Sequence, residues 1–160
     1  GPLWGALLVV AVIALIERTG ERGSRCGTLA LLAAALAAAS FVAVALLRSS
    51  NRAYYLAHLD MNYETVLVVW GTLVAGLAAS AWHFVGWAWL LIGAAGWRRR
   101  ALPRALSALY LVGGALALFH YVLRLEGGSL VLLASVLGVW QGALLWRAAP
   151  VDVPGAPAAP

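Results

Sequence analysis

The sequence predicts an all-α protein, a polytopic transmembrane helix bundle with about five spans and almost no soluble part. Of the 160 residues, 64% are hydrophobic and only 11% are charged, whereas a soluble domain carries about 25% charged residues to solvate its surface. So few charges cannot cover a water-facing exterior, but a lipid-facing exterior does not need them. The apolar residues also gather into five long stretches, which is the pattern expected of membrane spans.

The five predicted spans follow these stretches in chain order, over residues 3–16, 26–47, 66–96, 105–123 and 129–146. Each is expected to be a helix, because a chain in lipid must pair every backbone donor and acceptor within its own segment. The period-two alternation that a β-barrel requires is absent. Residues 1–149 would form a single transmembrane domain, and residues 150–160, rich in Pro and Ala, a disordered tail.

Two of the predicted spans have unusual lengths. Residues 3–16 make about 14 positions, fewer than the roughly 20 that cross a hydrocarbon core comfortably. We interpret them as a first helix that begins close to the N-terminus; if the chain is truncated, an upstream helix would give six spans with both ends inside. Residues 66–96 would rise about 46 Å against a core of about 30 Å, so this helix is expected to tilt or to extend beyond the outer surface.

All eleven basic side chains are arginines, and most of them fall on one side of a five-span bundle. The arginines on that side are Arg18, Arg22, Arg25, Arg98, Arg99, Arg100, Arg104 and Arg147. The positive-inside rule makes this side cytoplasmic, which places the N-terminus outside and the C-terminus inside, in what we expect to be a bacterial inner membrane. No basic face is longer than a loop, so nucleic acid is not an expected partner.

Small residues at four-residue spacing, Ala134, Gly138 and Gly142, form a GxxxG-type face on the last predicted span. Such faces let helix backbones approach closely in lipid. They predict packing within the bundle, against other membrane subunits or against a second copy, and they indicate no chemistry. The single cysteine, Cys26, excludes an internal disulfide and a multi-cysteine metal site.

Two histidines lie within the predicted spans, where ionisable side chains are costly and often functional. Helical periodicity places His83 on a face of small and polar residues that is expected to point to the bundle interior. His83 is 13 residues from Gly96, and His120 is 15 residues from Ala105. On antiparallel neighbours, both rings are therefore expected at nearly one height, about 20 and 22 Å above the inner ends.

Such a pair of histidines can supply both axial ligands of a b-type haem. Arg124, one turn beyond His120, would then be positioned for a haem propionate. The structural alternative, which we favour, is a hydrogen bond from each imidazole to a neighbouring helix. Pigment binding, proton relay and metal binding are further alternatives. The cofactor-binding hypothesis, for haem or a pigment, rests on His83, His120 and Arg124.

The segment between the second and third spans contains a polar cluster of His58, Asp60 and Glu64. Its spacing matches no strong metal-ligand pattern, so we favour an interfacial helix with its tyrosines at the headgroup level. The sequence contains no Ser–His–Asp set, no HExxH motif and no Gly-rich phosphate loop. We therefore expect no catalytic residues and a protein that is not an enzyme.

From Gly86 to Gly114 the chain reads GWAWLLIGAAGWRRRALPRALSALYLVGG. This segment resembles a widespread group of uncharacterised bacterial multi-pass membrane proteins, classed as a domain of unknown function. The shared elements are a Gly-rich apolar helix, a short basic loop, the sequence Leu-Pro-Arg and a helix with small residues. His83 and His120 match no position of that group. The resemblance implies an accessory or regulatory membrane protein and supplies no reaction.

Three functions are consistent with these patterns. The leading one is an integral membrane accessory or regulatory subunit that acts through helix–helix contacts. The second is a cytochrome b-like electron-transfer subunit with haem between His83 and His120. The third is a transporter, or a membrane protein that binds a lipophilic ligand or pigment; the absence of an internal proline in the five spans argues against a transporter.

Overall fold

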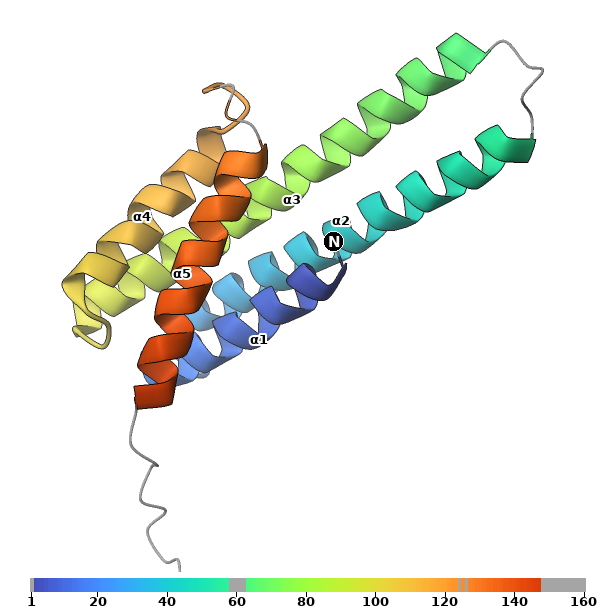
Figure 1. Cartoon of the computed structure of the whole chain (residues 1–160). Coiled ribbons are helices and arrows are strands. Elements are labelled where there is room, and N and C mark those ends of the chain that lie inside the picture. The colour runs from blue at the N-terminus through green and yellow to red at the C-terminus, as the bar shows by residue number, and fades with distance from the viewer. Residues whose placement is uncertain (1, 58–62, 124, 126, 148–160) are drawn as a thin grey trace, which may run out of the picture.

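The computed structural model describes residues 2–57, 63–123, 125 and 127–147, and within these residues it contains five helices and no strand (Figure 1). The helices are α1 over Pro2–Arg18, α2 over Arg25–Ala57, α3 over Tyr63–Arg99, α4 over Arg104–Phe119 and α5 over Gly127–Arg147. The all-α prediction is confirmed, and each of the five apolar stretches has a helix of its own. The expected disordered tail lies outside the described residues.

α2 and α3 are longer than predicted, and α4 is shorter. α2 continues ten residues beyond the predicted end at Leu47, to Ala57, because residues 48–57 contain neither Gly nor Pro to stop it. The first part of the expected interfacial helix is therefore the last part of α2. α4 ends at Phe119, four residues before the predicted end at 123, and turns follow it.

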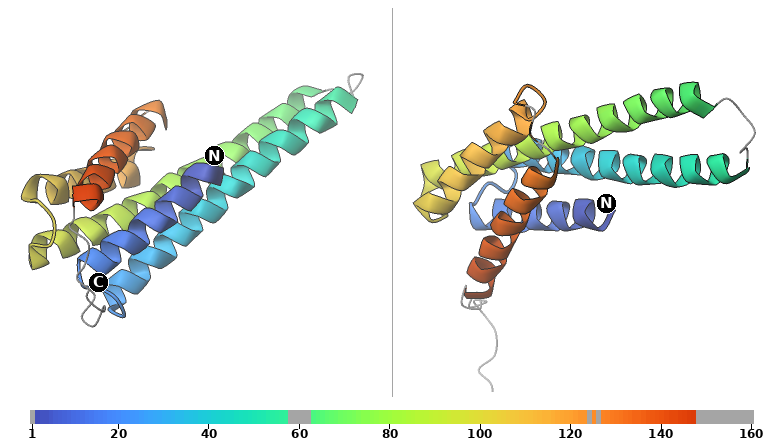
Figure 2. Two further views of the ribbon diagram at one scale, coloured as in Figure 1. Left: turned by 60° about the horizontal axis from the view of Figure 1, so that its bottom comes forward. Right: turned by 45° about the horizontal axis from the view of Figure 1, so that its top comes forward.

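A long antiparallel hairpin of α2 and α3 organises the fold (Figure 1). Their 33 and 37 residues rise about 50 and 56 Å, and one end of the hairpin extends well beyond the other helices (Figure 2). α1 packs along α2, and α4 returns along α3. α5 packs against α4 and runs at an angle to the α2–α3 hairpin. The sequence predicted that α3 is longer than a hydrocarbon core is thick. The similar excess length of α2 was not predicted.

Small and aromatic residues fill the contacts among the first three helices. Ala37 of α2 and Ala81 of α3 are completely buried, which lets the helix backbones approach closely. Trp4, Phe41 and Trp82, one from each of α1, α2 and α3, meet with ring centroids 5.1 to 5.7 Å apart. Edge-to-face and tilted ring pairs of this kind add to the stability gained from burial.

Two helices are long and apolar enough to cross a membrane: α2 over Arg25–Ser50 and α3 over Val66–Arg99. α4 and the Gly128–Leu144 part of α5 are apolar but shorter. By length and composition, two of the five helices qualify as spans, so the prediction of five spans is not confirmed.

Candidate functional site

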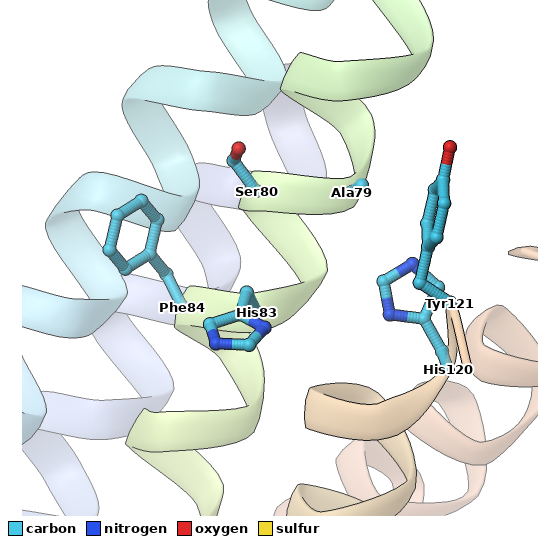
Figure 3. A pocket seen from close by; sticks show the side chains of 6 residues that line it. All are labelled: Ala79, Ser80, His83, Phe84, His120 and Tyr121. Atoms are coloured by element: carbon cyan, nitrogen blue, oxygen red, sulfur yellow. The ribbon is translucent and has the colours of Figure 1, made fainter. Parts of the chain in front are cut away.

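His83 and His120 line one open cavity between the middle of α3 and the end of α4. Its volume is about 250 Å³, and its lining residues are Ala79, Ser80, His83, Phe84, His120 and Tyr121. Both imidazole rings extend into this hollow (Figure 3). His83 lies 16 positions from Arg99 at the end of α3, and His120 lies 16 positions from Arg104 at the start of α4. Antiparallel packing therefore gives the two histidines a common height.

The ring of His120 is held in one tautomer by its own helix. Its Nδ1 atom lies 2.7 Å from the carbonyl oxygen of Ala117, and a carbonyl only accepts, so Nδ1 carries the proton and donates. In a neutral ring the lone pair is then on Nε2. Histidines that ligate metals usually donate their other ring N–H to a carbonyl or carboxylate in this way. Nε2 of His120 is thus the ring atom left to act as a ligand or acceptor.

His83 is exposed on the surface of the cavity, so the prediction that it faces the bundle interior is wrong. The cavity opens outward near the point where α4 ends. The nearby Ser80 hydroxyl donates to the Gly76 carbonyl of its own helix rather than to the ring. Neither histidine makes an interhelical hydrogen bond within the described residues.

The remaining predicted site residues cannot be joined to this cavity. Arg124, His58 and Asp60 lie outside the described residues, and Glu64 lies in the first turn of α3. Among the residues that the structure describes, no group of three or more His, Cys, Asp or Glu side chains is placed to hold a metal ion.

A buried carboxylate joins two arginine-bearing turns at the C-terminal end of α3. Glu21 is 2% exposed, and its Oε1 accepts hydrogen bonds from Arg99 Nε at 2.7 Å and from Arg98 Nη2 at 3.1 Å. Its turn is made possible by Gly20 and Gly23, whose φ values of 66° and 76° suit glycine. The turns before α2 and after α3 therefore lie at one end, as the arginine pattern predicts.

The charge of Glu21 is stabilised by these donors. A hydrogen bond with Ser24 is the largest cause that lowers the pKa of Glu21 below its ordinary value, and the bonds from Arg99 and Arg98 lower it further, against the opposing effect of burial. The sequence reading found the arginines but not this carboxylate. The available signal was a single acidic residue between two glycines in a segment rich in arginine.

Gln141 is a second polar residue that the sequence reading missed. Its side chain accepts a hydrogen bond from the Tyr110 hydroxyl at 2.8 Å and donates to the Ala11 carbonyl at 3.1 Å. These bonds tie α5 to α4 and to α1. The rule that singled out the histidines, a polar side chain inside an apolar stretch, also applies to this amide.

The small residues of α3, α4 and α5 divide into packed and open positions. A Cβ atom added to Gly86 would lie 2.8 Å from the Gly114 carbonyl oxygen, so the backbones of α3 and α4 touch there. Ala134 of the predicted GxxxG-type face is buried. Gly138 and Gly142 lie on an exposed side, and no atom of the described residues comes within 4 Å of an added Cβ at either position.

Comparison with known proteins adds no relative: no family model, no curated protein and no solved structure matches the chain. The resemblance seen between Gly86 and Gly114 gains no support from these comparisons. In the structure, the glycines of that segment have a packing role between α3 and α4.

Proposed function

We propose that this chain is a multi-pass membrane bundle that serves as an accessory or regulatory subunit through contacts with other helices. The observation that carries the proposal is the apolar exterior: all five helices expose large hydrophobic side chains, such as Leu3, Leu46, Val68, Val112 and Val139. A soluble monomer avoids large exposed apolar patches, whereas a lipid environment favours them. The two helices long enough to cross a membrane support the same location.

The outer face of α5 supports the role as a subunit. Leu130, Leu137 and Gln141 are buried against the rest of the chain, whereas Gly138 and Gly142 lie on the exposed side. Glycines at four-residue spacing let a second helix approach closely in lipid, where packing and backbone contacts drive association. An incoming helix therefore has room to pack on α5.

Membrane fractionation tests the location. The full chain is expected to sediment with membranes, to resist alkaline carbonate extraction and to require detergent for release. Recovery of the chain in the carbonate-soluble fraction would show that it is not embedded in the bilayer.

Substitutions on α5 test the subunit role. Gly138→Leu and Gly142→Leu fill the exposed face, where an added Cβ meets no described residue within 4 Å. Gly71→Leu on α3 is a matched control, because the same holds for a Cβ added there. In membranes, the cross-linked product between the chain and the helix that packs on α5 is expected to be lost in both α5 variants and to be retained in the control. Retention in all three variants would exclude this face of α5 as the contact.

A second candidate function, electron transfer by a bound haem, is favoured by the cavity between His83 and His120. Two imidazoles at one height fit an axial ligand pair. The hydrogen bond of His120 to its own helix uses Nδ1 and leaves Nε2 available. The cavity volume of about 250 Å³ is just below the roughly 300–1,000 Å³ of typical small-molecule sites. A tetrapyrrole would therefore lie partly in this cavity and partly against lipid or a neighbouring helix.

Absorption spectroscopy tests this candidate. Purified protein with added haem is expected to show a Soret band that His83→Ala and His120→Ala abolish. His58→Ala, at the third histidine of the chain, is the control and should leave the band unchanged. A preparation that stays colourless with added haem excludes the haem function and leaves the subunit function untouched.

A further inference from the structure

An apolar groove lies between α3 and α4 at the end of the molecule where a short turn joins these helices. Its volume is about 440 Å³, and its lining residues are Ala94, Trp97, Ala108, Leu111 and Val112. Trp97 and Val112 are 51% and 58% exposed, so the groove opens to the exterior and not to the core. Alanines on both walls leave room for a slender apolar group.

Both walls of the groove continue into an arginine at the turn. On α4, Arg104, Ala108 and Val112 are four residues apart, so they form one stripe along the helix. On α3, Trp97 lies in the last turn, and Arg100 follows the helix with a φ of 56°. The apolar groove therefore ends beside two exposed residues that each carry a guanidinium group.

The charge at this end of the groove is positive. Glu17 and Glu21, the two carboxylates at this end within the described residues, pair with other arginines. Arg100 and Arg104 are exposed, and within the same residues neither forms an ion pair. An anionic ligand group would therefore meet two guanidinium groups and no competing carboxylate among the described residues.

We propose that this surface binds one anionic phospholipid, with an acyl chain along the groove and the phosphate at Arg100 and Arg104. Guanidinium groups form strong, often bidentate hydrogen bonds with phosphate oxygens. The indole of Trp97 suits the headgroup level of a bilayer, and basic pockets between helices on the cytoplasmic side are suited to anionic headgroups. This inference rests on the membrane location proposed above and adds a specific ligand to it.

Lipid binding to the full chain in nonionic detergent tests the proposal, by native mass spectrometry and by the midpoint of thermal unfolding. Dioleoylphosphatidylglycerol is expected to remain bound and to raise the midpoint. Dioleoylphosphatidylcholine, which has the same chains but a zwitterionic headgroup, is expected to do neither. Glycerol phosphate, which has the phosphate without the chains, is expected to cause no shift.

Substitutions locate the site. R100Q and R104Q are each expected to weaken phosphatidylglycerol binding about fivefold, the effect of one arginine near an anionic headgroup. A108F fills the groove and should abolish binding, while the surface changes R100Q and R104Q keep the test decisive if A108F does not fold. R48Q, at an exposed arginine of α2 outside the α3–α4 turn, is the matched control and should bind as the unmodified chain does.

Three results would overturn the proposal: equal binding of the two phospholipids, an equal shift with glycerol phosphate, or an equal loss in R48Q. None of them bears on the membrane location, because carbonate extraction measures that location independently. A chain that is embedded in membranes but binds both lipids equally would retain the proposed function and lose only this lipid site.

Discussion

Gln141 is a buried amide in the middle of α5 that connects three helices through two hydrogen bonds, to Tyr110 and to Ala11. In lipid the hydrophobic effect no longer draws helices together, so polar bonds and close packing determine how a helix is attached. α5 shares fewer close neighbours with the other helices than α2 or α3 does. Gln141 therefore contributes to the attachment of α5 beside the buried Leu130 and Leu137.

Replacing Gln141 by leucine is expected to lower the free energy of unfolding by about 1–2 kcal/mol, because the change removes both bonds and leaves the Tyr110 hydroxyl without its partner. Tyr110→Phe removes only one bond and should cost about half as much. Unfolding in mixed micelles measures both values. The double variant should cost less than the sum, because the two changes share a bond; strict additivity would argue against the contact.

Glu21 makes the stability of the chain depend on pH in the acidic range. Its pKa in the folded state lies below the ordinary value of 4.5, so the unfolded chain binds the proton more readily. The stabilisation is then fully present above about pH 4.5 and is lost as the pH falls through the lowered pKa. Unfolding midpoints of the unmodified chain and of Glu21→Gln should differ most near neutral pH and converge in acid.

Glu17→Gln is the control for that measurement. Glu17 lies 3.8 Å from Arg22 with both side chains largely exposed, and exposed pairs contribute little. Its unfolding midpoint should follow the unmodified chain across the pH range. A difference between Glu21→Gln and the unmodified chain that persists unchanged in acid would show that the carboxylate charge is not the source of the stability.

At the scale of helices, glycines set the distance between α3 and α4. A Cβ at Gly86 would meet the backbone oxygen of Gly114 at 2.8 Å and the backbone nitrogen of Leu118 at 2.9 Å. Backbone atoms cannot rotate away as a flexible side chain can, so the helices must separate. Close contact of this kind requires glycine at both Gly86 and Gly114.

Gly86→Ala is therefore expected to destabilise the chain by about 1–3 kcal/mol, as overpacking does. Gly138→Ala, in open space on α5, is expected to be neutral or to stabilise by up to about 1 kcal/mol through helix propensity. Unfolding of the two variants under identical conditions measures the contrast. If Gly86→Ala is as well tolerated as Gly138→Ala, α3 and α4 do not pack through this glycine.

The helices were predictable from the sequence because apolar stretches in this chain are long and separated by polar segments. Their ends were less predictable, because residues 48–57 are polar but contain no helix breaker, and α2 continues through them. The common height of His83 and His120 followed from counting residues along two helices. The exposure of His83 could not be predicted in this way, because it depends on where α4 ends and on which residues cover the cavity beyond that end.

At the scale of the whole molecule, charge and length are distributed along one axis. The turns rich in arginine lie at one end, joined by Glu21, and the α2–α3 hairpin extends beyond the shorter helices at the other (Figure 2). An arginine-rich end suits the cytoplasmic surface. α2 and α3 exceed the thickness of a hydrocarbon core by about 20 and 26 Å, so the hairpin is expected to tilt or its free end to leave the bilayer.

Cysteine labelling decides between five spans and the two that α2 and α3 alone would provide. The chain has one cysteine, so Cys26→Ser gives a background free of thiols, into which Arg22→Cys, Ser49→Cys or Ser129→Cys is introduced. With five spans and the N-terminus outside, a maleimide that cannot cross membranes should label positions 49 and 129 in intact cells and position 22 only after permeabilisation. With two spans, α4 and α5 stay on the side of the arginine-rich turns, and position 129 should be labelled only together with position 22. Labelling of position 129 in intact cells thus requires α4 to cross the membrane, although its 16 residues are fewer than the roughly 20 of a typical span.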